Sequence, residues 1–338
     1  MLRISNISCP LDFTPDQAPR LAADTLGLPI EAILSARLAR RAIDARRKDN
    51  IHLVLTLEVE LAPGKRVDEK RLARAVTVAQ IRAVPYAYKK AAPLPCRPLV
   101  VGLGPAGLLA ALTLAEAGLC PVVIERGRPV EQRARDVNHF WHTGALDARS
   151  NVQFGEGGAG AFSDGKLNSG INDARCGEIR RVFCRHGAPE EVLYQAKPHI
   201  GTDKLPAMVR SIRNRIIELG GEVRFENRLC GLFIERGQIV GAQVEDARGD
   251  IAQLDTRDII LAIGHSARDT YEMLLSAGVP MQPKPFSIGA RIEHKQESIS
   301  RAQYGAMWKS LGAADYKLSC HLFLLLCCRQ RTAVFYPQ

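Results

Sequence analysis

The stretch that decides the fold is Leu99-Val-Val-Gly-Leu-Gly-Pro-Ala-Gly-Leu-Leu-Ala-Ala-Leu112, in which an apolar strand passes through a glycine turn into an apolar helix. Gly102 permits the tight turn, Gly104 lets a diphosphate approach the backbone, and Gly107 lets the helix pack on the strand. The diphosphate would lie at the helix N-terminus, where free N–H groups and the helix dipole attract anions. The residues predicted to bind it are Gly102, Gly104, Pro105, Ala106 and Gly107.

An acidic residue supports this interpretation. A second apolar strand is expected at 121–125, and it ends in Glu125. A carboxylate at this position can accept both hydroxyls of a ribose. The pattern GxGxxG alone is a weak signal, but strand, glycine turn, apolar-faced helix and downstream acid together predict dinucleotide binding. A glycine-rich turn in an α/β domain without a ligand is the alternative.

A second glycine cluster bears on which dinucleotide is bound. Arg126-Gly127 resembles the corresponding residues of flavoproteins of the glutathione-reductase type, which bind FAD in this unit. The segment 155–165 is rich in glycine, and its amides could line a phosphate or a flavin ring. No second strand–GxGxxG–helix is visible, so a separate NAD domain is not expected. The further cofactor-binding candidates are Arg126, Gly157, Gly158, Ala159, Gly160, Lys166 and Gly264. A surface loop is the alternative for the cluster.

Two side chains are catalytic candidates, and neither is decisive. A buried strand at 259–263 leads into Gly264 and then His265, a candidate proton donor near the flavin. A histidine in such a turn more often only caps it. Lys166 could favour reduced, anionic flavin through its charge, and a plain surface lysine is the alternative. No metal site is expected, because the nine cysteines include no CxxC pair.

Four segments together carry a specific family resemblance. They are Asn151–Asn168, Lys197–Asp203, Ala262–Thr270 and Lys284–His294. They resemble a bacterial family of uncharacterised FAD-dependent (NAD(FAD)-utilising) dehydrogenases, from the N-terminus to about Lys317. The resemblance implies FAD, a redox role and NAD(P)H as a candidate transient electron donor. It supplies no substrate beyond an unidentified small molecule and no oligomeric state.

These observations predict an α/β protein with three parts: a small N-terminal α+β domain, an FAD/NAD(P)-binding doubly wound domain split in sequence, and an inserted substrate domain. The predicted ranges are 1–95 for the small basic domain, 96–169 for the first part of the FAD-binding domain, 170–256 for the inserted domain, 257–280 for the return segment, 281–318 for the start of a further substrate-domain segment and 319–338 for an atypical tail.

The tail does not resemble the family. Flavoproteins of this class place a Gly-Asp near the C-terminus to hold the ribityl chain, whereas the only one here, Gly249-Asp250, is expected in a hairpin turn. A truncated or frameshifted chain that binds FAD poorly is therefore one expectation, and an inactive fragment is an alternative function.

Charge raises another alternative. Residues 1–95 hold sixteen Lys and Arg against ten Asp and Glu, so six of the ten net positive charges lie there. A flavin-dependent RNA-modifying or nucleic-acid-binding protein is the corresponding hypothesis, centred on the basic segment 37–48. This segment lacks aromatic residues for base stacking, and a solvated domain edge is the favoured interpretation. No apolar run reaches the ~18 residues of a spanning helix, and no signal peptide is visible, which predicts a cytoplasmic protein.

Local patterns complete the expectations. Strands are predicted at 2–7 and 51–61, the latter because its apolar residues alternate, and a helix is predicted to open at Thr14. Further helices are expected at 67–79, 204–219 and 268–277. Strands are expected at 222–225, 229–235 and 239–245, with Arg236-Gly237 as a hairpin turn.

Overall fold

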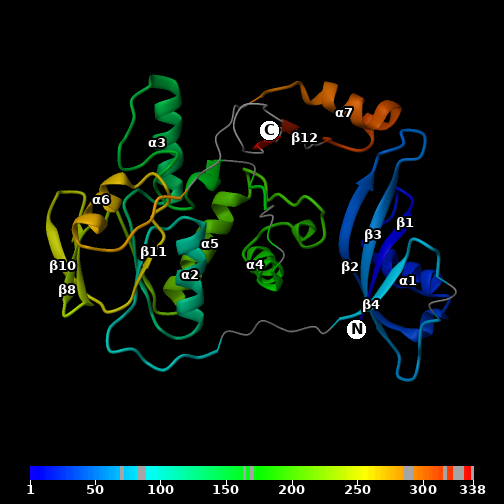
Figure 1. Cartoon of the computed structure of the whole chain (residues 1–338), viewed down its shortest axis with the longest axis horizontal. Coiled ribbons are helices and arrows are strands. Elements are labelled where there is room, and N and C mark those ends of the chain that lie inside the picture. Colours follow the sequence, from blue (N-terminus) through cyan, green and yellow to red (C-terminus); the bar gives the residue numbers. More distant parts are fainter. Residues whose placement is uncertain are drawn as a thin grey trace. The chain divides into compact units, whose positions relative to one another are not determined.

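The computed structural model describes residues 1–68, 72–81, 89–162, 165–167, 171, 173–284, 292–314, 318–322 and 331–335. Contacts divide the chain into two compact units (Figure 1). The first unit comprises residues 1–83 and 282–338, and the second comprises residues 84–281. Each unit is described separately below.

The first unit contains a four-stranded antiparallel sheet in the order β2-β3-β1-β4. Its strands are β1 (Leu2–Cys9), β2 (Ile33–Asp44), β3 (His52–Leu61) and β4 (Thr77–Gln80). Alternation in β3 buries Leu53, Leu55, Leu57 and Val59 in one core, as the period of two predicts. The strands predicted at 2–7 and 51–61 are therefore confirmed.

The helix predicted near Thr14 is also confirmed. It opens with a 3-10 turn, Pro15–Gln17, and continues as α1 (Ala18–Leu26). The backbone N–H of Thr14 donates to Gln17 Oε1 at 3.0 Å, the return half of a capping box. The short 3-10 turn η2 (Ile30–Ala32) then leads into β2.

The helix predicted at 67–79 is wrong. Thr77–Gln80 form β4, whose residues pair with β1 from Leu2↔Gln80 to Ser5↔Thr77. Residues 69–71 lie outside the described residues. The free edge of β1 offers a row of backbone hydrogen bonds, and this tertiary pairing overrides the local apolar spacing that suggested a helix.

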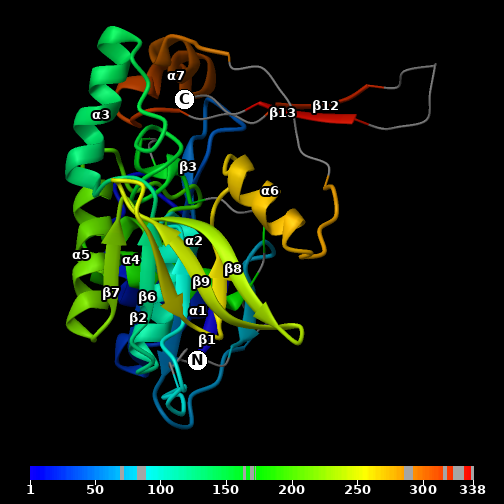
Figure 2. The ribbon, with the colours of Figure 1, turned by 90° about the vertical axis from the view of Figure 1, so that its left-hand side faces the viewer.

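Residues after 282 add small elements to the first unit. They are the helix α7 (Gln296–Tyr304), the 3-10 turn η6 (Gly305–Lys309) and the antiparallel pair β12 (Leu318–Leu322) and β13 (Arg331–Phe335), visible in Figure 2. Ile51, Tyr304 and Ala314 share a small buried cluster within this unit.

The second unit is built on a parallel sheet in the order β11-β5-β6-β7. The strands are β5 (Leu99–Val101), β6 (Val122–Glu125), β7 (Glu222–Phe225) and β11 (Ile259–Leu261). All three pairings are parallel, and β5 and β6 are buried along their whole length. β7 falls in the range predicted for an inserted domain, yet it is a strand of this sheet.

The two faces of the parallel sheet are covered differently. Val100 and Val123 pack into a core with α2 (Pro105–Glu116) and α5 (Leu205–Glu218), whereas Leu99 and Ile124 pack on the opposite side. That side carries an antiparallel sheet, β8 (Arg228–Glu235), β9 (Gln238–Glu245) and β10 (Ile251–Asp255). Figure 1 shows these layers, with α2 and α5 on one side of the parallel strands and β8 and β10 on the other.

The prediction of a doubly wound domain is therefore met only in part. The protein has a mixed α/β architecture, but an antiparallel sheet replaces the second helical layer. The sequence predicted the strands at 229–235 and 239–245 but not β10, and the local patterns do not reveal which sheet these strands join or which face they cover. The predicted turns are present: Arg236-Gly237 joins β8 to β9, and Gly249-Asp250 lies between β9 and β10.

The remaining helices of this unit include both expected and unexpected ones. The helices predicted at 204–219 and 268–277 are confirmed as α5 and α6 (Arg268–Ser276). The sequence patterns do not predict α3 (Val130–Thr143), α4 (Ala174–Arg185) or the 3-10 turns η4 (Ala159–Phe162) and η5 (Glu190–Leu193). None of the described helices is both long enough and apolar enough to cross a bilayer.

Candidate functional site

A cavity of about 490 Å³ lies at the carboxyl ends of three parallel strands of the second unit. This is the edge at which ligands of parallel sheets usually bind, and the volume is within the range of small-molecule sites. Ten residues named from the sequence line it: Gly102, Gly104, Pro105, Ala106, Glu125, Arg126, Gly158, Ala159, Gly264 and His265.

Two glycines of the first cluster are required by the protein's own packing. Gly102 has φ +95°, and a Cβ there would lie 2.5 Å from the carbonyl oxygen of Ala262. A Cβ on Gly107 would overlap the carbonyl oxygen of Gly102, so this glycine lets α2 pack on β5 as predicted. Gly107 is absent from the described lining of the cavity.

Gly104 is different, because no described neighbour requires it to be glycine. It is the N-cap of α2 and has φ −70° and ψ −177°, an extended conformation that any residue adopts. The atom nearest to an added Cβ would be Gly158 Cα at 3.8 Å, which is ordinary van der Waals contact. Gly104 lines the cavity. The missing side chain therefore keeps open a space that none of the described residues fills.

Glu125 ties three backbone segments together beneath the cavity. Its side chain is buried, with the residue 5% exposed. Oε2 accepts the N–H of Leu103 at 2.7 Å, and Oε1 accepts the N–H groups of Gly127 and Gly155, each at 2.9 Å. A carboxylate has about four acceptor positions, so three are used and about one remains. Its predicted contact with a ribose stays a prediction.

The second glycine cluster lies against the first, although some fifty residues separate them in sequence. The N–H of Gly157 donates to the carbonyl of Leu103 at 2.8 Å, and a Cβ on Gly158 would lie 3.2 Å from Gly104 Cα. The fold therefore brings the two glycine clusters into direct contact. Gly157 and Gly160 are not among the described lining residues.

Lys166 lies in another place. Its backbone forms an isolated bridge with His199, and it is not among the described residues that line the cavity. Lys166 was predicted to lie near a flavin because it directly follows the glycine cluster 155–165. Residues 163–164, between the two, lie outside the described residues.

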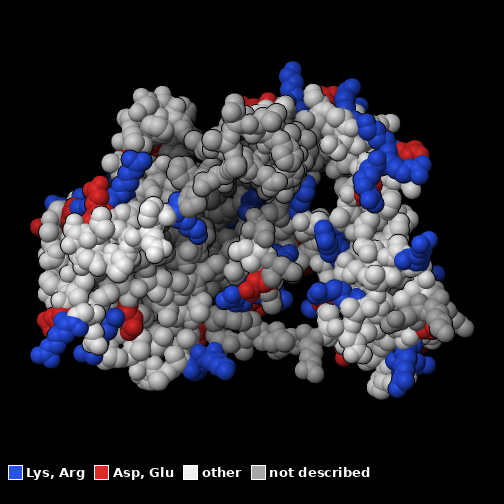
Figure 3. Space-filling view, viewed as in Figure 1, with Lys and Arg blue, Asp and Glu red and all other residues white. Residues whose placement is uncertain are grey.

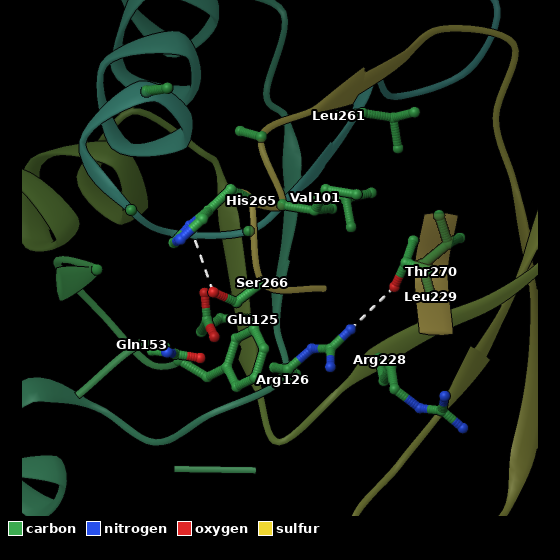
Figure 4. A pocket seen from close by; sticks show the side chains of 18 of the residues that line it. Val101, Glu125, Arg126, Gln153, Arg228, Leu229, Leu261, His265, Ser266 and Thr270 are labelled. Atoms are coloured by element: carbon green, nitrogen blue, oxygen red, sulfur yellow. Dashed lines mark hydrogen bonds between the residues drawn. The ribbon is translucent and has the colours of Figure 1, made fainter. Parts of the chain in front are cut away.

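Residues after β11, in the predicted return segment 257–280, line another side of the cavity. The N–H of Ala262 donates to the carbonyl of Val101 at 2.8 Å, next to the glycine turn. Gly264 and the exposed His265 line the cavity, and Tyr271 donates its hydroxyl proton to the Gly264 carbonyl at 2.9 Å. His265 Nδ1 lies 3.3 Å from Ser266 Oγ, and Figure 4 shows both side chains on the same side of the cavity as Glu125.

A charged network that the sequence did not predict borders the cavity. Arg126 donates to Thr270 Oγ1 at 2.9 Å (Figure 4) and to Asp269 at 3.0 Å. Its guanidinium also stacks 4.4 Å above the Phe154 ring. Arg228 also donates to Asp269, at 2.8 Å. Although burial raises the pKa of Asp269, the hydrogen bonds from both arginines hold it below its usual range.

A usable signal for these residues existed in the sequence. Arg228 follows the predicted strand 222–225, and in a parallel sheet the residues just after a strand gather at the ligand edge. Assigning that strand to an inserted domain hid the signal. Phe154 directly precedes the glycine cluster, where its ring could have been expected to face the same site.

The basic segment of the first unit has local partners. On the face shown in Figure 3, Lys and Arg predominate over Asp and Glu in this unit. Arg37 pairs with Glu58, and Arg46 pairs with Asp44. Part of the positive charge of this segment is therefore neutralised by carboxylates of the same unit. Among the described residues, no group of three His, Cys, Asp or Glu side chains is placed to hold a metal ion.

Comparisons with known proteins give two family matches. Residues 1–60 match "Domain of unknown function (DUF8436)", and residues 285–327 match "FAD-dependent protein, C-terminal domain-like". A Clostridium beijerinckii protein described as "Uncharacterized protein" is 40% identical over 320 residues, which are 94% of this chain and 59% of that protein. The chain thus spans little more than half the length of this curated relative.

Solved structures resemble the chain only partly. The THI4 protein of Thermovibrio ammonificans is 16% identical, with 54% of this chain and 62% of that chain covered and a TM-score of 0.38. A glycerol-3-phosphate dehydrogenase of Bacillus halodurans complexed with FAD is 11% identical, with coverage of 53% and 36% and a TM-score of 0.34. The FAD-dependent family match supports FAD, the cofactor predicted from the sequence.

Proposed function

We propose that the second unit binds FAD, with its ADP half in the cavity at Gly104, and that the protein is an FAD-dependent oxidoreductase acting on a small molecule. The observation that carries this proposal is Gly104. It lines the cavity and has an ordinary conformation, and its own protein neighbours leave room for a side chain. A diphosphate brought against the backbone is a physical reason for a glycine there.

The surrounding groups fit the parts of such a ligand. The first turn of α2 offers N–H groups without intrahelical partners and the positive end of the helix dipole to the diphosphate. The remaining acceptor position of Glu125 suits a ribose hydroxyl. Beyond Glu125 the cavity reaches Asn227 and Leu229, which would offer an amide and an apolar contact to adenine.

The redox chemistry would come from the cofactor: bound FAD accepts and returns a hydride or single electrons. This chain's residues would position it and control protons. His265, in the return segment, lines the cavity and has an imidazole that can exchange a proton, so we assign it the candidate role of exchanging a proton at its ring nitrogens. Lys166 receives no role, because it does not line the described cavity.

A titration of the whole chain tests the proposal. FAD binding is followed by the change in flavin fluorescence, and ADP is added as a competitor. We expect FAD to bind, ADP to displace it, and Gly104→Val to weaken both by at least about tenfold, since its side chain fills the space of the diphosphate. The control is Gly177→Ala, on α4 and away from the cavity, which should bind as the parent does.

Two results would oppose the proposal. Unchanged FAD affinity in a folded Gly104→Val protein would show that the diphosphate does not lie there. Failure of the parent to bind either FAD or ADP would remove the cofactor from the cavity altogether. If FAD binds, adding NADH or NADPH without oxygen and watching the visible flavin absorbance tests the predicted electron donor.

A further inference from the structure

Arg133 is the largest fully buried side chain of the protein's described residues, with an exposed fraction of 0%. It lies on α3, in a polar stretch to which the sequence patterns assign no role. An arginine is almost never fully buried unless its donors are satisfied. Burial lowers the pKa of Arg133 to about 10, so it still carries its charge at neutral pH.

Its donors are satisfied by one loop. Nε donates to the Asn151 carbonyl at 2.8 Å and Nη2 to the Val152 carbonyl at 2.8 Å. Nη1 donates to the Glu156 carbonyl at 2.6 Å and to the Gly158 carbonyl at 2.8 Å. A guanidinium has five N–H donors in a planar fork. All four hydrogen bonds of Arg133 given above end on the segment 151–158.

The same segment lines the proposed cofactor cavity. Phe154, Gly155 and Gly158 are lining residues. The N–H of Gly155 is accepted by Glu125, and the N–H of Gly157 by the Leu103 carbonyl. Carbonyls of the loop therefore point toward the guanidinium of Arg133. Two N–H groups of the same loop point the other way, toward Glu125 and the Leu103 carbonyl.

The contact also explains a glycine. Gly155 has φ +117°, and a Cβ there would overlap the side chain of Arg133. The guanidinium further packs 4.7 Å above the ring of Phe162, at the end of the same glycine cluster. Arg133 is thus enclosed by the loop on several sides.

We propose that Arg133 is a positioning residue that holds the loop 151–158 in its ligand-binding shape before the cofactor arrives. This inference rests on the proposed binding of a dinucleotide in the cavity. A loop that is fixed in advance loses less conformational freedom when the ligand binds. The affinity for the dinucleotide therefore depends on Arg133, although Arg133 is not among the described residues that line the cavity. In the sequence, Arg133 lies six residues after Gly127.

The fork geometry makes the arginine specific. Lysine keeps the charge but places its three donors on a single nitrogen, which cannot reach four carbonyls spread over eight residues. We therefore expect Arg133→Lys to keep the fold and lose most of the loop ordering. Arg133→Met removes the charge as well. The matched control is Arg135→Met, an exposed arginine on the same helix.

The test combines hydrogen exchange without ligand and ADP titration on the full chain. In both Arg133 variants, the amides of Gly155 and Gly157 should exchange at least about tenfold faster, because they depend on the shape of the loop. Amides of β5 and α2 should keep their protection. The dissociation constant for ADP should rise by about tenfold or more, as expected when several hydrogen bonds to a charged group are lost. Arg135→Met should match the parent in both measurements.

The two readouts separate the possible failures. If the parent does not bind ADP but the loop amides respond as described, the proposed function fails and the ordering role of Arg133 stands. If Arg133→Lys exchanges like the parent, or if protection falls equally in the loop, β5 and α2, the residue does not act by positioning the loop. ADP affinity unchanged in a protein with a loosened loop would equally overturn the inference.

Discussion

Glu125 supports the glycine turn as well as facing the cavity, and removing its carboxylate should destabilise the second unit strongly. In Glu125→Ala the N–H groups of Leu103, Gly127 and Gly155 lose their acceptor. Leaving a buried donor unsatisfied costs ~1–3 kcal/mol. Three such groups predict a loss of at least about 3 kcal/mol in the free energy of unfolding, even if water enters and recovers part of the cost.

Glu125→Gln distinguishes this explanation from a simple loss of volume. A glutamine oxygen in the place of Oε1 still accepts from Gly127 and Gly155, whereas its NH₂ group faces the N–H of Leu103. One hydrogen bond is lost rather than three, which predicts a loss of about 1–3 kcal/mol. Glu235→Ala, at an exposed position, is the control and should stay within about 0.5 kcal/mol of the parent.

The assay must report on the second unit alone, because a chain with two compact units need not unfold in one step. The chain has two tryptophans, Trp141 in the second unit and Trp308 in the first. All variants are therefore made in a Trp308→Phe background, and urea unfolding is followed by the fluorescence of Trp141. If Glu125→Ala costs less than about 1 kcal/mol, or if glutamine costs as much as alanine, the three hydrogen bonds do not have the assigned role.

Three further outcomes follow from the same geometry and are measured in the same assay. Gly107→Ala should cost about 3 kcal/mol or more, since its Cβ would overlap a backbone oxygen, while Gly104→Ala should cost under about 1 kcal/mol; equal costs would contradict this contrast. Burial raises the pKa of Glu156, whose Oε1 has no hydrogen-bond partner, so ionising it costs stability. The free energy of unfolding of Glu156→Gln should therefore rise relative to that of the parent as pH rises from about 4.5 toward neutrality. A difference between the two that does not change with pH would refute this. Asp269→Asn should lower the free energy of unfolding by up to about 1 kcal/mol at neutral pH, since the ion pair is partly exposed. The loss should shrink as pH falls below 3.8, because protonation of Asp269 removes the same attraction in the parent. A loss that grows toward low pH would contradict this.

Much of the candidate site could be predicted because its signals are local. The glycine turn, Glu125 and the return strand each follow an apolar strand, and residues at strand ends of a parallel sheet share one edge. The alternating segment 51–61 likewise reports directly on one buried face, since a strand's side chains alternate. Glycines are informative for the same reason, because each marks a tight turn or a close approach in its own neighbourhood.

What could not be predicted depends on partners distant in the sequence. Thr77–Gln80 are a strand because β1 has a free edge, and β7 joins β6 across nearly a hundred residues. Arg133 looked like one polar residue among several, and its burial is set by carbonyls of a loop whose shape the sequence does not state. Asp269 belongs to the site because Arg126, just after β6, and Arg228, at the start of β8, both donate to it.

The most direct test of the central claim is a crystal structure of this chain with ADP bound. We predict that the diphosphate lies against Gly104 at the N-terminus of α2, that the ribose contacts the Glu125 carboxylate, and that the loop 151–158 keeps its contacts with Arg133. ADP bound elsewhere on the chain, or bound in the cavity with its diphosphate away from Gly104 and no contact to Glu125, would contradict the claim.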